Sequence, residues 1–538
     1  MAIRPIARVL IVDNDPRVGP DLQAMLEPLG YRVQIAQGVG QVLLDQTVAI
    51  AYSFRPNVAI VDLRLLNEYR DERSGFELLE SLQSARCILY SAHLTPEVTR
   101  EALRRYGAAN WVSKSESPQR LLDSIADAAR ESCAWQRDLS IHRPSAWTSH
   151  RIIRTLFGKD TDVLPEIVDD VLGQLFPKNR EVTLEIGGGE AVTSLPVSRG
   201  HSVVLKAQPD DFEPVVVKLA SAEQIRSEDA NYRKYVKDRL VGRFYAQLER
   251  AVEFWDLGGA VYSFLGSSLR ALPSFTVFYR KETDHRAISR TLYHFFTEVW
   301  SRHYGQPLGD RPIPLFQFYD EPLRLRERLE GFGNQEERRS FPGLTVSLIN
   351  PVPWVLRHAE DSLIPGARQA ITHGDLHGDN LFTDGEHIWA IDFERAGPGH
   401  ILRDFVELEV DIVTRLLSLI EGDFSLLYEL AVVLAEPSEP TASLRQTEKL
   451  LANSETRKAL DVIAGLRQLA YEITHYPDSR EYLWGLLLDA LFVATLVSEE
   501  SPQWERSLLL GAVLCGRLRH WGEEWPPKDW PPVAPGMV

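Results

Sequence analysis

Short apolar runs that end in a carboxylate recur within the first 132 residues of the chain. One run covers residues 8–12 and ends at Asp13, and another ends at Asp62. Such runs are typical of buried parallel strands, and the amphipathic stretches between them have helical spacing. Repeated strand–helix units predict a doubly wound, five-stranded parallel sheet, with its sites at the carboxyl ends of the strands.

The predicted strand ends bring together four residues that share this position: Asp13, Asp62, Ser91 and Lys114. Their order and spacing over about residues 7–132 resemble a response-regulator receiver domain, which has a flavodoxin-like fold. The resemblance implies that Asp62 is phosphorylated, that Ser91 and Lys114 contact the phosphoryl group, and that Trp111 changes rotamer. The chemistry agrees, because a carboxylate nucleophile needs a divalent ion and a lysine around the phosphoryl oxygens.

One departure from the receiver pattern affects the expected Mg²⁺ site. The family has two adjacent acids after the first strand, whereas this chain has Asp13 followed by Asn14. Asn14 still offers a carbonyl oxygen, so Asp13, Asn14 and Asp62 are the predicted Mg²⁺ ligands. A docking module that is not phosphorylated is the alternative interpretation.

A second informative stretch covers residues 371–394 and reads ITHGDLHGDNLFTDGEHIWAIDFE. Phosphoryl transfer from ATP needs one carboxylate that accepts the proton of the attacking hydroxyl. It also needs an amide oxygen and a second carboxylate that hold Mg²⁺. Asp375 is therefore the predicted catalytic residue, and Asn380 and Asp392 are the predicted metal ligands. A metal-dependent hydrolase using His373, Asp375 and His377 is a weaker alternative, because histidine ligands usually need a third partner at helical or loop spacing and the nearby sequence has none.

The pattern His-Gly-Asp-x-His-x-x-Asn, followed by Ile-Asp-Phe, resembles the aminoglycoside phosphotransferase and choline kinase branch of the kinase-like fold. This resemblance implies an α+β bilobal domain over residues 181–520. It further implies ATP and Mg²⁺ as cofactors and a hydroxyl group as the acceptor.

The Val-x-Val-Lys motif that ends at Lys218 resembles the third strand of kinases, in which the lysine grips the ATP phosphates. Glu228 is the predicted carboxylate that orients Lys218, with Glu223 as the alternative. Ser198 and Gly200 lie in the loop that is predicted to cover the phosphates.

Two further segments complete the predicted domain organisation, a helical connector over residues 133–180 and a Pro- and Trp-rich tail over residues 521–538. Apolar residues recur at helical spacing between residues 163 and 175, which is typical of one buried face. This pattern favours core packing over a connector helix or a helix that forms a homodimer. The tail either lies on the surface or docks on the body.

Composition limits the partners and the compartment. The net charge of −17 argues against nucleic acid and anionic membranes as partners, because phosphate binding requires clustered basic residues. Three cysteines are too few for a disulfide framework, which fits a reducing cytoplasm. Residues 483–497 are apolar but shorter than the ~20 residues of a membrane span, so a buried helix is expected.

Together these patterns predict a cytoplasmic, two-component-type signalling protein. A cognate sensor histidine kinase or another phosphodonor would phosphorylate the receiver, which would regulate an ATP-dependent phosphotransferase acting on an unknown hydroxyl acceptor or protein partner. The alternative is a pseudokinase or scaffold that binds nucleotide or partners without phosphoryl transfer.

Overall fold

The computed structural model of the chain describes residues 7–67, 69, 71–132, 139–185, 202–210, 212–240, 244–267, 270–333, 336–419, 424–527 and 530. The chain divides into two compact units, Met1–Asp229 with Gln247–Arg270, and Ala230–Ala246 with Ala271–Val538. Among the described residues, no helix is both long enough and apolar enough to cross a membrane.

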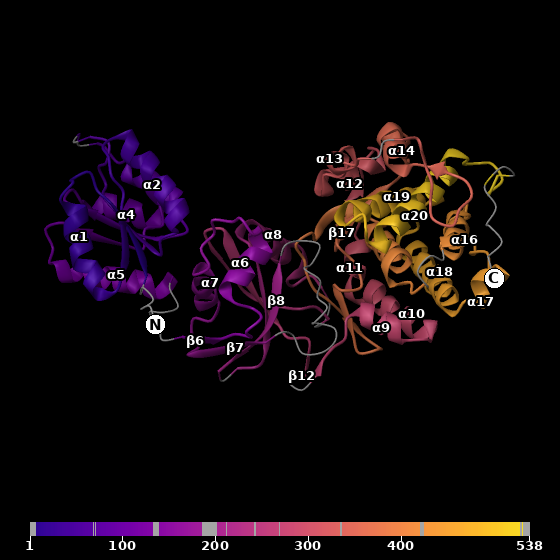
Figure 1. Cartoon of the computed structure of the whole chain (residues 1–538), viewed down its shortest axis with the longest axis horizontal. Helices are drawn as coiled ribbons and strands as arrows, with labels where there is room; N and C mark the ends of the chain where they lie inside the picture. The colour runs from indigo at the N-terminus through magenta and orange to yellow at the C-terminus, as the bar shows by residue number, and fades with distance from the viewer. Residues whose placement is uncertain are drawn as a thin grey trace. The chain divides into compact units, whose positions relative to one another are not determined.

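The first unit begins with a five-stranded, all-parallel sheet, drawn in indigo and violet in Figure 1, with the strand order β2-β1-β3-β4-β5. Its strands are β1 (Arg8–Val12), β2 (Arg32–Ile35), β3 (Val58–Val61), β4 (Arg86–Ser91) and β5 (Asn110–Ser113). One face packs against α1 (Val18–Leu26) and α5 (Pro118–Ser132), and the other against α2 (Gln41–Phe54), α3 (Gly75–Ser81) and α4 (Pro96–Arg104). A 3₁₀ turn, η1 (Glu27–Leu29), follows α1.

This strand order is that of a flavodoxin-like fold, so the prediction of a doubly wound parallel sheet is confirmed. Helices cover both faces of the sheet, and β1 and β3 are buried along their whole length. Strands in such a position read as continuous apolar runs rather than as an alternation, which explains the pattern in the sequence.

The rest of the first unit is a six-stranded sheet with the order β10-β11-β9-β8-β7-β6. Neighbouring strands are antiparallel except for β6 and β7, which are parallel. The strands are β6 (Ser140–His142), β7 (Glu181–Glu185), β8 (Val203–Pro209), β9 (Val215–Ser221), β10 (Leu248–Phe254) and β11 (Leu257–Ser263). The helices are α6 (Ser149–Phe157), α7 (Ile167–Leu175) and α8 (Ala222–Asn231).

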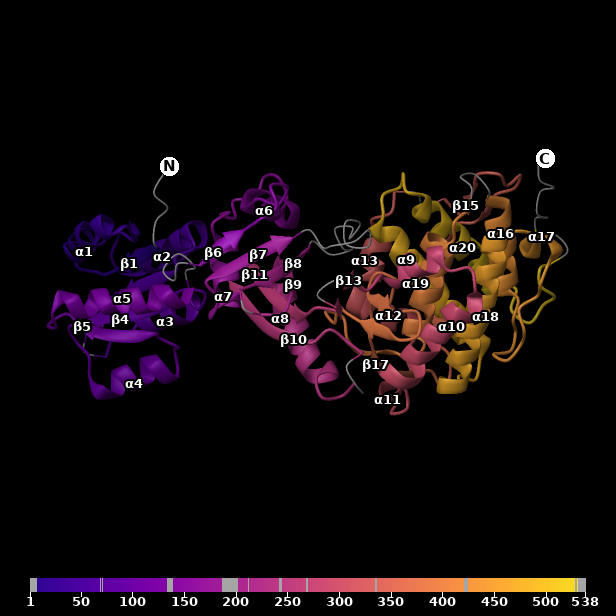
Figure 2. The ribbon, with the colours of Figure 1, turned by 90° about the horizontal axis from the view of Figure 1, so that it is seen from below.

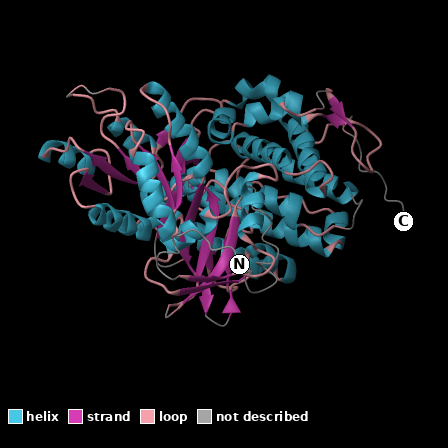
Figure 3. Cartoon of the chain, turned by 60° about the vertical axis from the view of Figure 1, so that its left-hand side comes forward, coloured by secondary structure: helices cyan, strands magenta, loops and turns pink. Residues whose placement is uncertain are grey.

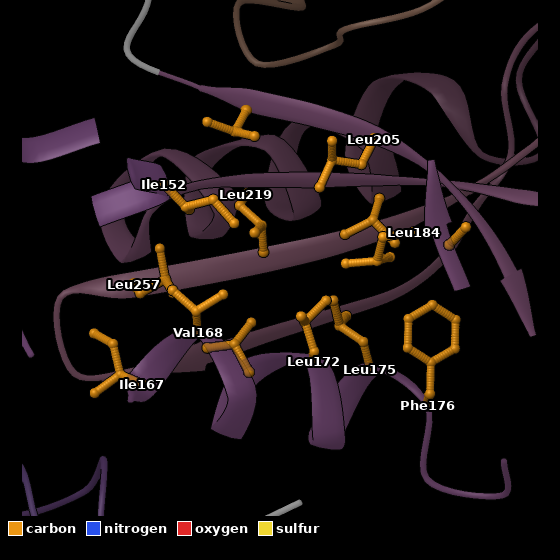
Figure 4. Close-up of a cluster of buried hydrophobic side chains, with 14 of the residues drawn as sticks. Ile152, Ile167, Val168, Leu172, Leu175, Phe176, Leu184, Leu205, Leu219 and Leu257 are labelled. Atoms are coloured by element: carbon orange, nitrogen blue, oxygen red, sulfur yellow. The ribbon is translucent and has the colours of Figure 1, made fainter. Parts of the chain in front are cut away.

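Residues 139–180 differ from the predicted helical connector, because they supply β6, α6 and α7 to the core of this sheet. Helix α7 lies across β10 and β11 (Figure 2). Val168 and Leu172 point from α7 toward the sheet, where Leu257 and Leu219 are part of the same buried cluster (Figure 4). The apolar face of residues 163–175 is therefore core, as the sequence pattern favours, since one face of the sheet needs a cover.

The second unit is mainly helical. Figure 3 draws the helices of the whole chain in cyan and its strands in magenta. Its helices are α9 (Phe275–Lys281), α10 (His285–His294), α11 (Ser301–Tyr304), α12 (Leu315–Leu323), α13 (Leu325–Glu330), α14 (Pro351–His358), α15 (Arg403–Asp411), α16 (Phe424–Ala435), α17 (Glu448–Ala452), α18 (Ser454–Thr474), α19 (Ser479–Leu496) and α20 (Pro502–Arg519). Short π and 3₁₀ segments are η3 (Tyr232–Val236), η4 (Phe295–Val299), η5 (Ala359–Ser362) and η6 (Ile412–Leu416). The apolar residues 483–497 form most of α19, which is the buried helix that was expected.

The strands of the second unit are short. A three-stranded sheet has the order β14-β17-β20, and β18 pairs with β19 in a hairpin, as β15 does with β16. Their bounds are β14 (Gly309–Asp310), β15 (Arg338–Arg339), β16 (Leu348–Ile349), β17 (Arg368–Thr372), β18 (Leu381–Thr383), β19 (Ile388–Ala390) and β20 (Gly397–His400). The two-residue strands β12 (Gly266–Ser267) and β13 (Arg270–Ala271) precede them.

The Pro- and Trp-rich tail docks on the second unit through Trp525. This side chain is buried, and its indole N–H donates a hydrogen bond to the carbonyl of Val432 at 3.1 Å. Of the two positions that the sequence left open for the tail, docking on the body is the one observed here. Residues 531–538 lie outside the described residues.

Candidate functional site

Asp13, Asp62 and Lys114 meet at the carboxyl end of the five-stranded sheet. Lys114 Nζ lies 2.7 Å from Asp13 Oδ2 and 2.9 Å from Asp62 Oδ2. Both carboxylates are buried, and the lysine is one-fifth exposed. These residues follow β1, β3 and β5, and parallel strands end at a common edge, so the topology itself brings the three groups together.

The charges of this cluster act on one another. Burial raises the pKa of Asp13 above its ordinary value, although the ammonium group of Lys114 opposes the shift. Burial alone would lower the pKa of Lys114, but the carboxylates of Asp62 and Asp13 together raise it. Two carboxylates and one ammonium leave a net negative charge among oxygen donors, which is the donor chemistry that Mg²⁺ prefers.

The other predicted receiver residues lie around this cluster. Ser91 is buried at the end of β4, where its carbonyl accepts a hydrogen bond from the N–H of Lys114 at 3.1 Å. Trp111 is half-buried in β5, and Asn14 is half-buried directly after Asp13. Asp15 pairs with Arg17, whose hydrogen bonds lower the pKa of Asp15 to about 2.

Lys218 and Glu228 form a buried ion pair in the six-stranded part of the first unit. Lys218 Nζ on β9 lies 2.9 Å from Glu228 Oε2 on α8, and both side chains are almost fully buried. The hydroxyl of Tyr262 on β11 hydrogen-bonds the other oxygen of Glu228. The alternative carboxylate, Glu223, is exposed on α8. Ser198 and Gly200 lie outside the described residues.

Asp375, Asn380 and Asp392 lie around the β18–β19 hairpin of the second unit. Asn380 precedes β18 and Asp392 follows β19, so both are at the open end of the hairpin. The N–H of Ile391 donates to the carbonyl of Asn380 at 3.0 Å, which holds the two strand ends together. Asn380 Nδ2 donates to the carbonyl of Asp375 at 2.9 Å. Asn380 therefore contacts Asp375 through its side chain and contacts Ile391, the residue before Asp392, through its backbone.

The carboxylate of Asp375 has a positively charged partner. Its Oδ1 lies 3.1 Å from Arg395 Nη1, and the guanidinium of Arg395 in turn lies over the ring of Phe492. His377 Nε2 is farther away, 3.8 Å from Asp375 Oδ2.

The backbone geometry requires glycine at position 374, directly before Asp375. Gly374 has φ of +76°, and a Cβ at this position would lie 2.4 Å from the carbonyl oxygen of Arg395. Any side chain here would therefore clash with backbone, whereas protein kinases have arginine in their corresponding motif.

Three carboxylates on α15 hold the backbone of the loop at residues 373–378. Asp404, Glu407 and Asp411 are spaced three and four residues apart, so they share one face of the helix. The N–H groups of this loop donate to them, His373 and Gly374 to Asp404 at 2.9 Å each, Leu376 to Glu407 at 2.7 Å and Gly378 to Asp411 at 2.8 Å. A role for Glu407 and Asp411 was not predicted from the sequence. Acidic residues at helical spacing within an apolar stretch indicate carboxylates on a buried helix face, and this pattern could have identified them.

Replacing Asp404 with Ala should destabilise the second unit, because it leaves three buried donors without their acceptor. These are two backbone N–H groups and the hydroxyl of Tyr304. Each unsatisfied buried group costs about 1–3 kcal/mol. Hydrogen exchange of the loop amides measures the loss, and Asp404→Asn, which keeps one oxygen acceptor, should lose less. Equal protection in Asp404→Ala and the unsubstituted chain would contradict the role of Asp404.

Comparisons with known proteins match the two parts of the chain separately. Residues 322–494, which include Asp375, Asn380 and Asp392, match the family described as Ternary complex associated domain 9. The N-terminal part is similar to the transcriptional regulatory protein MctR of Rhizobium johnstonii, with 28% identity over 133 residues, 24% of this chain and 58% of the relative. It is also similar to the two-component response regulator PprB of Pseudomonas aeruginosa, with 29% identity over 124 residues, 22% of this chain and 42% of the relative.

Among solved structures, the chemotaxis protein CheY4 of Vibrio cholerae has 23% identity and a TM-score of 0.19, covering 23% of this chain and 98% of that one. The chain spans about half the length of the two curated relatives. The parallel sheet has the strand order of a flavodoxin-like fold, and the N-terminal part is similar in sequence to a two-component response regulator. Both observations support the prediction of a receiver domain in this part of the chain. The family matched over residues 322–494 is not described as a kinase.

Proposed function

We propose that this protein is a signalling protein whose phosphorylatable receiver regulates an ATP-dependent phosphotransferase of kinase-like fold. The observation that supports the proposal is that Asn380 contacts Asp375 and the residue before Asp392 at the open end of one short hairpin. A carboxylate base, an amide oxygen and a second carboxylate are the groups that phosphoryl transfer to a hydroxyl requires.

The roles follow from the chemistry of each side chain. Asn380 and Asp392 would hold Mg²⁺, because amide and carboxylate oxygens are its preferred protein ligands. Bound ATP supplies the phosphoryl group, and the Mg²⁺ ion neutralises negative charge on the phosphate oxygens. Asp375 would accept the proton of the acceptor hydroxyl, and Arg395 would hold this carboxylate in one orientation.

Within the first unit, Lys218 is the residue for which the sequence predicts a phosphate-binding role. A buried lysine is costly unless a carboxylate compensates its charge, and Glu228 does so at 2.9 Å. In the proposed role, Lys218 would contact the α- and β-phosphates, while Glu228 and Tyr262 would fix the position of the lysine.

The receiver would act as the switch. A histidine phosphodonor would pass its phosphoryl group to a carboxylate oxygen of Asp62, so that the donor N–P bond breaks, an O–P bond forms and the released imidazole is protonated from solvent. Asp13, Asn14 and Asp62 would hold Mg²⁺ beside this group, and Lys114 would pair with its oxygens. Ser91 and Trp111 would respond to its presence.

The test is ATP turnover by the full chain in the presence of Mg²⁺, with and without beryllofluoride as a mimic of the phosphoryl group on Asp62. Asp392→Asn serves as the blank, because it removes one charge from the proposed metal site. We expect turnover that the blank lacks and that beryllofluoride changes. Absence of both ATP binding and turnover would refute the proposal.

A pseudokinase or scaffold is the second candidate, and two observations favour it. Arg395 already pairs with the carboxylate of Asp375, and the family matched over residues 322–494 is described as associated with a ternary complex. Tight ATP binding without turnover, across a panel of hydroxyl acceptors, would select this alternative.

A further inference from the structure

The two-residue turn between β10 and β11, Trp255–Asp256, contacts the receiver within the first unit. The indole N–H of Trp255 donates to the carbonyl of Pro56 at 3.0 Å, and its ring meets Tyr52 edge-on at 5.8 Å. Arg55 Nε donates to Asp256 Oδ2 at 2.5 Å. Trp255 packs against the buried clusters of both the receiver and the six-stranded sheet, so this turn joins the two cores.

The backbone of this contact is strained. Trp255 has φ of +55° and Arg55 has φ of +48°, in the left-handed region that asparagine and glycine favour. A bulky side chain is unfavourable in this region, because its Cβ crowds the backbone there. Glycine at position 255 would adopt this φ without strain. The turn itself therefore does not require tryptophan, and the side chain serves the contact with Pro56 and Tyr52.

On the receiver side, the contact lies at one end of β3 and the phosphorylation site at the other. Arg55 and Pro56 come shortly before Val58, where β3 begins, and Asp62 directly follows the strand. A shift of β3 that accompanies a change at Asp62 would therefore reach the Trp255–Asp256 turn through four strand residues.

On the other side, the same turn holds the start of α8. The N–H of Ala222, the first residue of α8, donates to the carbonyl of Asp256 at 2.8 Å. Gly258 lies so close to α8 that a Cβ there would come within 2.7 Å of Ile225. Helix α8 carries Glu228, the partner of Lys218, so displacement of the turn displaces the carboxylate that positions this lysine.

We infer that the Trp255–Asp256 turn couples the Asp62 site of the receiver to the Lys218–Glu228 pair, so that occupancy of one site changes ligand affinity at the other. The inference rests on the proposed function, in which Lys218 binds the phosphates of ATP. Coupling of this kind is reciprocal, because each ligand must change the affinity of the other by the same factor.

The experiment measures the Kd of the full chain for the non-hydrolysable ATP analogue AMP-PNP with Mg²⁺, with and without beryllofluoride. Coupling between two sites is typically about 5- to 150-fold, and we expect a ratio of Kd values in this range. The Kd for beryllofluoride, measured with and without AMP-PNP, should change by the same factor.

Two variants remove the contact in different ways. Trp255→Gly removes the ring and relieves the strain, and Asp256→Asn removes the charge that pairs with Arg55 but keeps the carbonyl that caps α8. In both variants the ratio should fall to within about twofold of one. Asp127→Asn breaks an exposed ion pair with Arg130 elsewhere on the receiver and should keep the full ratio.

The outcomes separate the inference from the proposed function. If AMP-PNP binds with a Kd that beryllofluoride leaves unchanged, or if both variants keep the full ratio, the inference is overturned while the nucleotide site stands. If AMP-PNP does not bind under either condition, the proposed function fails and the inference fails with it. The beryllofluoride Kd of each variant without nucleotide shows whether its receiver is folded.

Discussion

Replacing Asp375 with Asn is expected to lower ATP-dependent phosphoryl transfer by about 10²- to 10⁴-fold, the usual contribution of a general base. Asparagine has nearly the same shape but does not accept the proton of the acceptor hydroxyl. Asn380 also contacts the carboxylate of Asp375 at 3.4 Å, but its shorter hydrogen bond goes to the backbone carbonyl of residue 375 and survives the substitution. Nucleotide affinity should therefore change little, and steady-state turnover together with a direct binding titration measures both quantities.

Asp384→Asn is the matched control for this prediction. Asp384 is at the turn of the same β18–β19 hairpin, where its carboxylate accepts hydrogen bonds from the N–H groups of Glu386 and His387. Asparagine keeps such an acceptor and suits turns, so this variant should retain turnover. If Asp375→Asn loses nucleotide affinity as strongly as turnover, Asp375 is not the base but part of the binding site.

The second large effect concerns the buried ion pair between Arg8 and Asp170. Arg8 Nη2 at the start of β1 lies 2.8 Å from Asp170 Oδ2 on α7, and the two side chains are 6% and 2% exposed. Arg8→Met keeps the apolar stem but leaves the carboxylate buried without its cation. Breaking a buried pair in this way costs about 3–5 kcal/mol. Hydrogen exchange of the β1 and α7 amides in the full chain measures the loss as a lower free energy of opening.

The loss should depend on pH in a definite direction. Burial raises the pKa of Asp170, although the charge of Arg8 opposes this shift. A carboxyl group with a raised pKa holds its proton more tightly when folded. Its stabilising contribution is present at low pH and is lost as the pH rises from about 4, the ordinary value, through the raised pKa. Without Arg8 the pKa of Asp170 rises further. The loss of stability in Arg8→Met should therefore become smaller as the pH is lowered.

The double variant with Asp170→Leu tests the physical cause. Two apolar side chains of similar volume often replace a buried ion pair at no cost, so the double variant should recover most of the lost stability. Asp170 also hydrogen-bonds the side chain of Asn57. A double variant that is less stable than Arg8→Met would show that the contact depends on packing or on this hydrogen bond rather than on the unpaired charge.

Local sequence patterns determined the receiver fold and the grouping of its charged residues. Apolar runs that end in Asp13 and Asp62 predict buried parallel strands, and such strands share one edge, so Lys114 joins the carboxylates there. The short spacing between Asp375 and Asn380 likewise placed both residues at one hairpin. In each case the distance along the chain is short or the topology is regular, so the local pattern is enough to predict that the residues lie close together.

Only the tertiary structure decided which surfaces cover one another. An apolar face on residues 163–175 indicates burial, but not that the six-stranded sheet is its partner. The contacts of Trp255 with Pro56 and of Arg55 with Asp256 join residues about two hundred positions apart. The hydrogen bonds between the carboxylates of α15 and the loop at residues 373–378 likewise join segments that are separated in the sequence. The physical reason is that a local pattern encodes how much of a side chain is buried, whereas its partner is set by the packing of the whole chain.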